Sequence, residues 1–379
     1  MWEDFLIEFL KKDPIKGQVP RETLHAPWPQ GMDLQRLYTL PVDGWGRLGY
    51  DEKNDWEAAM KKKTTFGLLG LAAAGAGAAG GWAALGNYLY NQIMVPQVRE
   101  PESADANPVQ GEGRLWARKR EGFREATIQA VDGLILWAAL VPGRPDCHRW
   151  AVCVHGYHDT YESMGAIAKH YGGLGWNVLL PDQRGHGQSE GDYVGWGYDE
   201  RLDLVGWCNY IARKDPEAEI VLHGVSMGAA AVLMATGGAL PQQVKAAVSD
   251  CAYTSIEAEL RHVLGQLDGT LPTRIPLPAG VLFAALRKTA LRRAGFDLRD
   301  AAPIQAVAQS AVPTLFIHGV EDDFVPASMM GKLYQAAKGP KSFLWMPGAG
   351  HAEAVGTDPG LYWTAVSTFL RDYFPELGE

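Results

Sequence analysis

The sequence predicts an α/β fold with a mainly parallel sheet covered by helices on both faces. From about Arg114 onward, short apolar runs typical of strands alternate with helical patterns, as they do in parallel sheets. One stretch, Glu219 to Ala235 (EIVLHGVSMGAAAVLMA), passes from a β-branched run through a glycine-flanked turn into an Ala-rich helical pattern. Ligands of such sheets bind at the carboxyl ends of the strands, so a functional site is expected at this turn.

The composition fits one large domain with an appendage. The chain has 379 residues, and its hydrophobic content of 47% is enough for a sizeable core. A net charge of −9 and a pI near 5.6 argue against nucleic acid as a partner, since such a surface needs clustered Lys and Arg. The four cysteines lack C-x-x-C spacing and a histidine cluster, so we interpret them as buried small hydrophobes and predict no metal site.

The first part of the chain predicts a membrane anchor. Residues 1–63 form an appendage whose role the sequence does not state. Residues 64–95 carry no charge, follow the triplet Lys61-Lys62-Lys63, and are long enough to cross a bilayer as a helix. Trp82 and Tyr88 suit the membrane interface. A buried Ala/Gly-rich helix or a flexible linker is the alternative, because Ala and Gly are only weakly hydrophobic.

The charges on either side of this segment predict its orientation. Lysines precede it and the acidic residues Glu100 and Glu102 follow it, which favours a cytoplasmic N-terminus. The expected protein crosses the membrane once, with the large domain, residues 114–379, outside the cytoplasm. Residues 96–113 are rich in Pro, Gly and acids without an apolar period, which predicts a linker.

The large domain begins with a hairpin and continues as alternating strands and helices. ATIQAV and LILWAALVP flank Asp132-Gly133, a pair typical of a hairpin turn. The later apolar runs and helical patterns predict strands at Trp150–Val154, NVLLPD, EIVLHGV, VKAAVSD, TLFIHG and SFLWMP, and helices near 161–174, 199–213, 328–337 and 359–374.

The turn at Ser226 predicts a nucleophile. Gly224 and Gly228 remove Cβ atoms where a strand folds directly back into a helix, so the serine stands exposed at the apex. The amide of Met227, at the start of that helix, points to where negative charge would develop on an attacked carbonyl. These residues therefore supply a hydroxyl and one half of an oxyanion hole.

Two later loops supply the residue types that a serine nucleophile needs. Asp322 follows the strand TLFIHG, and His351 follows the strand SFLWMP, giving the chain order nucleophile, acid, base. A histidine takes the proton of the serine, and a carboxylate orients that histidine and stabilises its charged form. Asp323 is adjacent to Asp322, and the sequence leaves open which of the two is the acid.

The loop after an early strand predicts the second oxyanion donor. His155-Gly156-Tyr157 follows the strand residues AVCV, and the amide of Tyr157 is placed to donate because glycine before it permits a close turn. We assign His155 and Gly156 to the substrate-binding surface, with His155 as a supporting hydrogen-bonding residue.

From about Arg114 to Glu379 the chain resembles the α/β-hydrolases, in the bacterial group that includes serine aminopeptidase-like and prolyl-oligopeptidase-like esterases. The resemblance implies an eight-stranded sheet, with Ser226 as nucleophile, His351 as base and Asp322 as acid. It rests on the motifs VHGYHD (154–159), DQRGHGQSEG (182–191), HGVSMG (223–228), HGVEDDFVP (318–326) and GAGH (348–351).

The resemblance also implies a small helical cap inserted before the acid-bearing strand, at about 253–300. An apolar cap excludes water and shapes a slot for an acyl chain. Leu264, Leu267 and Phe283 are the candidate substrate-binding residues there, with packing of the cap on the core as the alternative for each.

Together these features predict a serine hydrolase that cleaves a carboxylic ester or thioester through an acyl-enzyme. A serine peptidase or aminopeptidase is the alternative within enzymes. A membrane-tethered binding protein on a hydrolase fold is the alternative outside them. The expected partner is a small acyl ester or peptide substrate, and no metal or organic cofactor is implied.

Overall fold

The computed structural model describes residues 77–96, 107–266 and 277–374, which lie in the compact unit Val42–Glu379. The appendage 1–63, the first part of the expected membrane segment and Leu267 fall outside the described residues.

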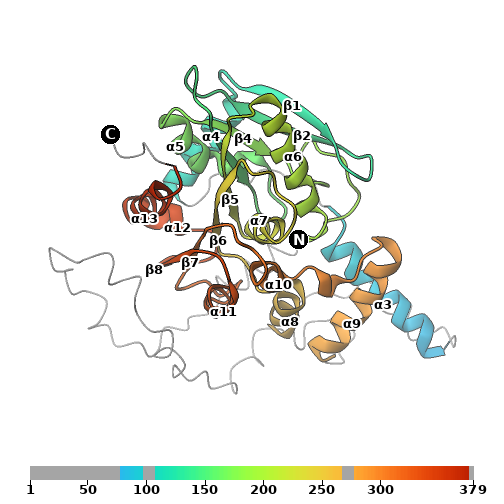
Figure 1. Ribbon diagram of the computed structural model, residues 1–379. Coiled ribbons are helices and arrows are strands. Elements are labelled where there is room, and N and C mark those ends of the chain that lie inside the picture. Colours follow the sequence, from blue (N-terminus) through green and yellow to red (C-terminus); the bar gives the residue numbers. More distant parts are fainter. Residues whose placement is uncertain (1–76, 97–106, 267–276, 375–379) are drawn as a thin grey trace, which may run out of the picture. The chain divides into compact units, whose positions relative to one another are not determined.

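An eight-stranded sheet forms the centre of the described chain, in the order β1-β2-β4-β3-β5-β6-β7-β8 (Figure 1). Strand β2 pairs antiparallel with β1 and β4, and every other pair is parallel. The hairpin predicted at Asp132-Gly133 is confirmed, and Gly133 adopts a φ of 96° there. The strands are β1 Arg124–Gln129, β2 Ile135–Val141, β3 Arg149–Val154, β4 Asn177–Pro181, β5 Glu219–Val225, β6 Val244–Asp250, β7 Thr314–Gly319 and β8 Lys341–Met346.

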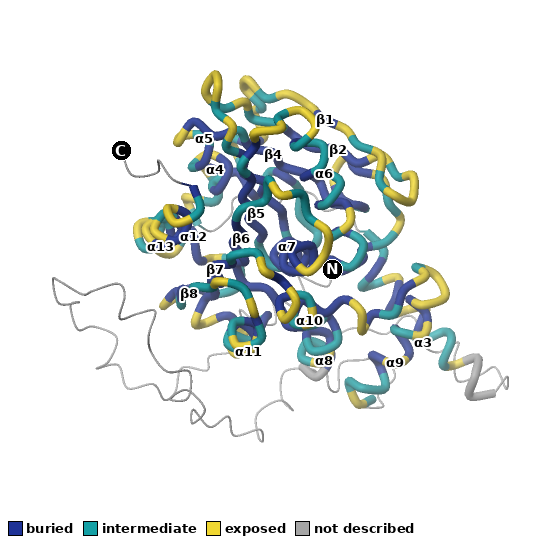
Figure 2. Tube along the Cα trace, in the orientation of Figure 1, coloured by how far each residue is buried: buried dark blue, intermediate teal, exposed yellow. Residues whose placement is uncertain are grey.

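Helices cover both faces of this sheet because its central strands are apolar on both sides (Figure 2). On β3, Ala151 and Cys153 pack with helices α5 and α13, whereas Val152 and Val154 pack with α6 and α7. The helices are α3 Gly77–Ile93, α4 Pro108–Lys119, α5 Gly165–Gly173, α6 Glu200–Lys214, α7 Met227–Thr236, α8 Ile256–Gln266, α9 Ala279–Arg293, α10 Pro303–Val307, α11 Ser328–Ala336, α12 Ala354–Thr357 and α13 Pro359–Arg371, with 3₁₀ turns at Tyr161–Met164 and Leu298–Asp300.

The strand register brings the functional loops to one edge of the sheet. Val154 of β3 lies opposite Gly224 of β5, and Val225 lies opposite Asp250 of β6. Asp250 in turn lies opposite Ile317 of β7. The loops that follow these four parallel strands therefore emerge side by side, although they are far apart in sequence.

Helix α4 begins inside the stretch 96–113 that the sequence predicts as a linker. Asn107 caps the helix by accepting a hydrogen bond from the amide of Val109 at 2.9 Å, and Pro108 occupies its first turn. Gly113 packs so closely on α5 that a Cβ there would lie 2.6 Å from the Cα of Ala166. The last residues of the stretch predicted as a linker are therefore helical, because α4 is stabilised by contacts that local composition does not reveal.

Helix α3 falls in the C-terminal half of the segment 64–95 and packs against cap helix α9 (Figure 1). Arg293 of α9 donates a hydrogen bond to Asn91 Oδ1 at 2.7 Å, and its guanidinium lies over the ring of Tyr90. Within the ranges 77–96, 107–266 and 277–374, none of the helices has the length and apolarity needed to cross a membrane.

Candidate active site

Ser226 lies between strand β5 and helix α7 in a strained turn. Its φ of 56° and ψ of −120° are unusual for a residue with a side chain. Both flanking glycines are required. A Cβ on Gly224 would lie 2.5 Å from the carbonyl carbon of Gly228, and one on Gly228 would lie 2.7 Å from the carbonyl carbon of Val154. The turn therefore has the geometry that the sequence predicts.

Ser226, His351 and Asp322 form a continuous hydrogen-bonded chain. Ser226 Oγ lies 2.8 Å from His351 Nε2, and His351 Nδ1 lies 2.8 Å from Asp322 Oδ2. The side chain of Asp322 is completely buried, whereas that of His351 is 22% exposed. With the Nδ1 proton directed at the carboxylate, Nε2 is left as the acceptor for the serine proton.

The loop after β7 buries Asp322 and leaves Asp323 exposed. Oδ1 of Asp322 accepts hydrogen bonds from the amides of Phe324 (3.1 Å) and Val325 (2.8 Å). Burial by itself would raise the pKa of Asp322, but hydrogen bonds from His318 and His351 outweigh it and lower the pKa to about 2. The carboxylate is therefore ionised at neutral pH. The structure places Asp322, and not Asp323, beside His351.

His318 is a neighbour of the acid to which the sequence analysis gave no role. Its Nε2 lies 3.2 Å from Asp322 Oδ2 and 2.9 Å from the carbonyl oxygen of Val325. One carboxylate oxygen thus faces two imidazoles, which restricts its rotation. The signal available in the sequence is the position of His318 at the end of the strand, four residues before Asp322.

The two segments that carry the amides predicted for an oxyanion hole both lie next to Ser226. Met227 is the first residue of α7, and the first amides of a helix have no acceptor inside it. The loop that carries Tyr157 runs beside the serine, since a Cβ on Gly156 would lie 3.8 Å from Ser226 Oγ. This arrangement is compatible with two amides facing one developing charge.

The ring of His155 stabilises that loop through two hydrogen bonds. Its Nε2 accepts a hydrogen bond from the amide of Gln183 at 3.0 Å, so the proton of the neutral ring lies on Nδ1, which donates to the carbonyl oxygen of Gly156 at 2.7 Å. Burial and the nearby His186 lower the pKa of His155 to about 3, so the ring stays neutral. These bonds give His155 a structural contact within the loop, and its contact with a substrate stays a prediction.

The side chain of Tyr157 ties the same loop to helix α3. Its hydroxyl donates to the carbonyl oxygen of Ile93 at 2.9 Å, and its ring stacks on Trp196 with centroids 4.3 Å apart. The sequence did not predict this contact, because the helix precedes the hydrolase domain.

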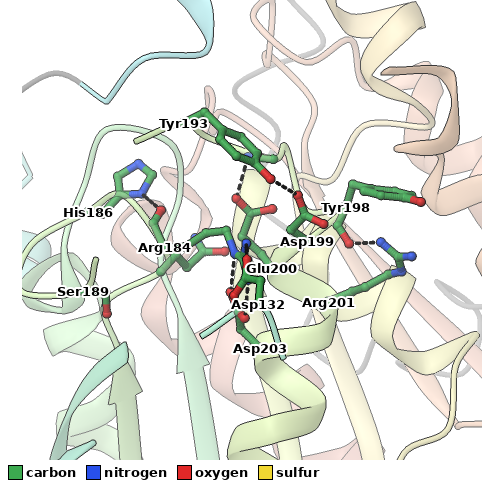
Figure 3. Close-up of polar contacts among 12 residues, drawn as sticks. Asp132, Arg184, His186, Ser189, Tyr193, Tyr198, Asp199, Glu200, Arg201 and Asp203 are labelled. Atoms are coloured by element: carbon green, nitrogen blue, oxygen red, sulfur yellow. Dashed lines mark hydrogen bonds and ion pairs between the residues drawn. The ribbon is translucent and has the colours of Figure 1, made fainter. Parts of the chain in front are cut away.

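The loop 182–191 is organised by a buried cation (Figure 3). Arg184 pairs through two nitrogens with both carboxylate oxygens of Asp203 and through a third with Asp132, each at 2.7 Å. Glu200 lies beside this group and accepts from the amide of Gly195 at 2.8 Å. Burial raises the pKa of Glu200 to about 7. These ion pairs hold the loop 182–191 to helix α6 and to the turn at Asp132.

The cap residues named as candidate substrate contacts are buried. Leu264 of α8 and Phe283 of α9 are each 2% exposed, and Arg261 lies over the ring of Phe283. Helices α8 and α9 pack against each other, so this burial does not require a substrate, and substrate contact remains a proposal for both residues.

One group of potential metal ligands is present within the described part of the chain. The side chains of Cys251, Asp322 and His351 offer ligand atoms within 4.8 Å of one another. Two of these three belong to the hydrogen-bonded chain that ends at Ser226.

Comparison with known proteins places the fold in a family. The family model described as serine aminopeptidase, S33, matches residues 145–294. The uncharacterized protein Rv2307c of Mycobacterium tuberculosis is 31% identical over 255 residues, covering 66% of this chain and 79% of that protein. The α/β-hydrolase domain-containing protein WAV2 of Arabidopsis thaliana is 27% identical, covering 67% and 80%. The uncharacterized Bacillus subtilis protein YqkD is 30% identical over 52% of this chain and 63% of its own length.

Solved structures agree on the architecture. The Pyrococcus furiosus esterase Pf2001 superposes with a TM-score of 0.55 at 17% identity, covering 74% of this chain and 98% of that one. At this identity the likeness shows the fold alone. Together with the sequence relatives, it shows that the chain belongs to the α/β-hydrolase superfamily.

Proposed function

We propose that this protein is a serine hydrolase that cleaves carboxylic esters or thioesters through an acyl-enzyme. The observation that carries the proposal is the chain Ser226 Oγ to His351 Nε2 to Asp322 Oδ2, with both links at 2.8 Å. A serine hydroxyl is a weak nucleophile unless a base within hydrogen-bond reach takes its proton, and this arrangement supplies one.

The proposed reaction has two halves. In the first, Ser226 attacks the substrate carbonyl while His351 takes its proton, and the amides of Met227 and Tyr157 bind the negative oxygen. His351 then protonates the leaving alcohol or thiol. In the second half, His351 activates a water molecule that releases the acyl group and restores the hydroxyl of Ser226. The ionised Asp322 stabilises the imidazolium in both halves.

A fluorophosphonate probe tests this proposal, because it reacts with an activated serine and not with ordinary ones. We expect covalent labelling of the full chain that disappears in Ser226→Ala. Ser342→Ala is the matched control, since Ser342 lies in strand β8 at the end away from the site. Absence of labelling in folded protein would overturn the proposal and favour the alternative of a binding protein on a hydrolase fold.

A peptidase or aminopeptidase is the second candidate, favoured by the serine aminopeptidase family model over residues 145–294. A panel of p-nitrophenyl esters and aminoacyl anilides separates the two. We expect turnover of short and medium acyl esters, with Leu264 and Phe283 contributing to chain-length preference. Faster turnover of the anilides would reverse the assignment.

We further propose that the segment 64–95 holds the chain at a membrane through the residues that precede the C-terminal end of α3, since Asn91 and Ile93 are bonded to the hydrolase domain. Residues 114–379 would then lie outside the cytoplasm. The support is the uncharged segment after Lys61-Lys62-Lys63. Protease treatment of intact cells tests the orientation. Digestion of the large domain is expected, and full protection would reverse the topology.

A further inference from the structure

Cys251 occupies a strained position immediately behind the proposed nucleophile. It follows the last residue of β6 and has a φ of 52°, in the left-handed region that favours glycine. Its amide donates to the carbonyl oxygen of Ile317 at 2.9 Å, and the carbonyl oxygen of Asp250 accepts from the amide of Ser226 at 2.8 Å. The residue is thus held between the strand that carries the serine and the strand that carries the acid.

Its thiol faces the acid and base of the triad. Cys251 Sγ, a carboxylate oxygen of Asp322 and a ring nitrogen of His351 all lie within 4.8 Å of one another, and Cys251 is 1% exposed. The cysteine is free rather than bridged. From the sequence alone Cys251 is interpreted as a small hydrophobe, because nothing local reveals its position beside the acid and base.

Thiolate, imidazole and carboxylate are the ligands that Zn²⁺ prefers in proteins. In a tetrahedral zinc site with bond lengths of about 2.0–2.3 Å, neighbouring ligand atoms are roughly 3.3–3.6 Å apart. The present spacing of at most 4.8 Å therefore needs shifts of about 1 Å, which side-chain rotation can supply. A fourth position would be left for water.

We propose that Cys251, His351 and Asp322 form a binding site for Zn²⁺, or a similar thiophilic divalent cation, that switches the hydrolase off. The inhibition rests on the proposed function, whereas the binding does not. The cation enters from the side of His351, the partly exposed member of the group.

Metal binding releases one proton from the protein and replaces one hydrogen bond. The thiol of Cys251 loses one proton to solvent as its sulfur binds the metal. His351 Nδ1 gives up its hydrogen bond to Asp322 and binds the metal through its lone pair, and the neutral ring carries its proton on Nε2 instead. Nε2 then cannot accept the proton of Ser226, so the nucleophile is not activated.

The test combines inhibition with a direct measurement of binding. Zn²⁺ is titrated against ester hydrolysis by the full chain in a buffer that does not chelate metals, and each variant is compared with its own metal-free rate. Cys251→Ala should raise the half-inhibitory Zn²⁺ concentration by at least about 10–100-fold, since a ligand is lost. Cys251→Gly tests the same point in a form that suits the positive φ, and Cys147→Ala is the cysteine control, expected to behave as wild type.

Cd²⁺ supplies a readout that needs no activity. Its bond to thiolate gives an ultraviolet charge-transfer band, expected in wild type and in Ser226→Ala but lost in Cys251→Ala and Cys251→Gly. If the wild type proves inactive in ester hydrolysis, the Cd²⁺ band by itself shows whether Cys251 binds a metal. Equal Zn²⁺ inhibition with and without Cys251, or a Cd²⁺ band that does not depend on Cys251, would overturn the inference.

Discussion

The substitution Gly228→Ala tests how closely the turn at Ser226 packs on strand β3. A Cβ at this position would overlap the carbonyl oxygens of Val154 and His155 and lie 2.7 Å from the carbonyl carbon of Val154. These are backbone atoms at the carboxyl end of the central strand β3, so they cannot rotate away as a side chain could. Because non-bonded carbons prefer about 3.5–4.0 Å, Gly228→Ala must push the start of helix α7 outward by roughly 1 Å.

The expected effect on catalysis is larger than the effect on stability. Helix α7 carries the amide of Met227, so its displacement moves a proposed oxyanion donor away from the reacting carbonyl. Loss of one such donor lowers kcat by about 10²–10³-fold. Overpacking of this kind destabilises a fold by about 1–3 kcal/mol, so most of the protein should remain folded.

Steady-state hydrolysis of a p-nitrophenyl ester, with a thermal melt of the same sample, measures both effects. We expect kcat to fall with little change in KM. Gly331→Ala is the control, because Gly331 lies within α11 and a Cβ there meets nothing within 4 Å. That variant should gain about 0.5–1 kcal/mol. An unchanged kcat in folded Gly228→Ala would refute the reasoning.

Three further predictions concern charged groups. Asp322→Asn should lower kcat by about 10⁴-fold while Asp323→Asn leaves it near wild type, and the opposite ranking in ester hydrolysis would move the acid by one residue. Burial raises the pKa of Glu200 to about 7, so the stability associated with its protonated form is present at low pH and is lost as pH rises through that value. Glu200→Gln should therefore gain more in Tm relative to wild type at about pH 8 than at about pH 5, and a gain independent of pH would contradict this assignment. Arg184→Ala leaves the buried carboxylate of Asp203 unpaired and should cost about 3–5 kcal/mol in urea unfolding, whereas Arg118→Ala, in an exposed ion pair, should cost about 0–1 kcal/mol.

The sequence predicts the features that are determined by residues close together in the chain. Strand and helix alternation, the hairpin at Asp132-Gly133 and the turn at Ser226 each depend on neighbouring residues. The sheet register then brings the loops of Asp322 and His351 to the turn, because parallel strands of one sheet end at a common edge. Such features can be predicted because one physical rule decides each of them.

Features that depend on distant partners could not be predicted. Helix α4 has linker-like composition, yet it packs against α5 through Gly113. Asp322 and Asp323 are equivalent by sequence, and only the turn amides that bind Asp322 distinguish them. The position of Cys251 beside the acid and base follows from an irregular φ at the end of β6, which no periodicity reveals.

Helix α3 makes bonds to different parts of the hydrolase domain at its C-terminal end. Asn91 bonds to Arg293 of the cap, Ile93 to Tyr157, and the carbonyl oxygen of Met94 accepts from the amide of Val194 at 2.7 Å. A recombinant fragment cut at the start of the β-strands would lack all of these acceptors. The minimal fragment for biochemical study should therefore begin upstream of α3, at a point that motif boundaries alone would not suggest.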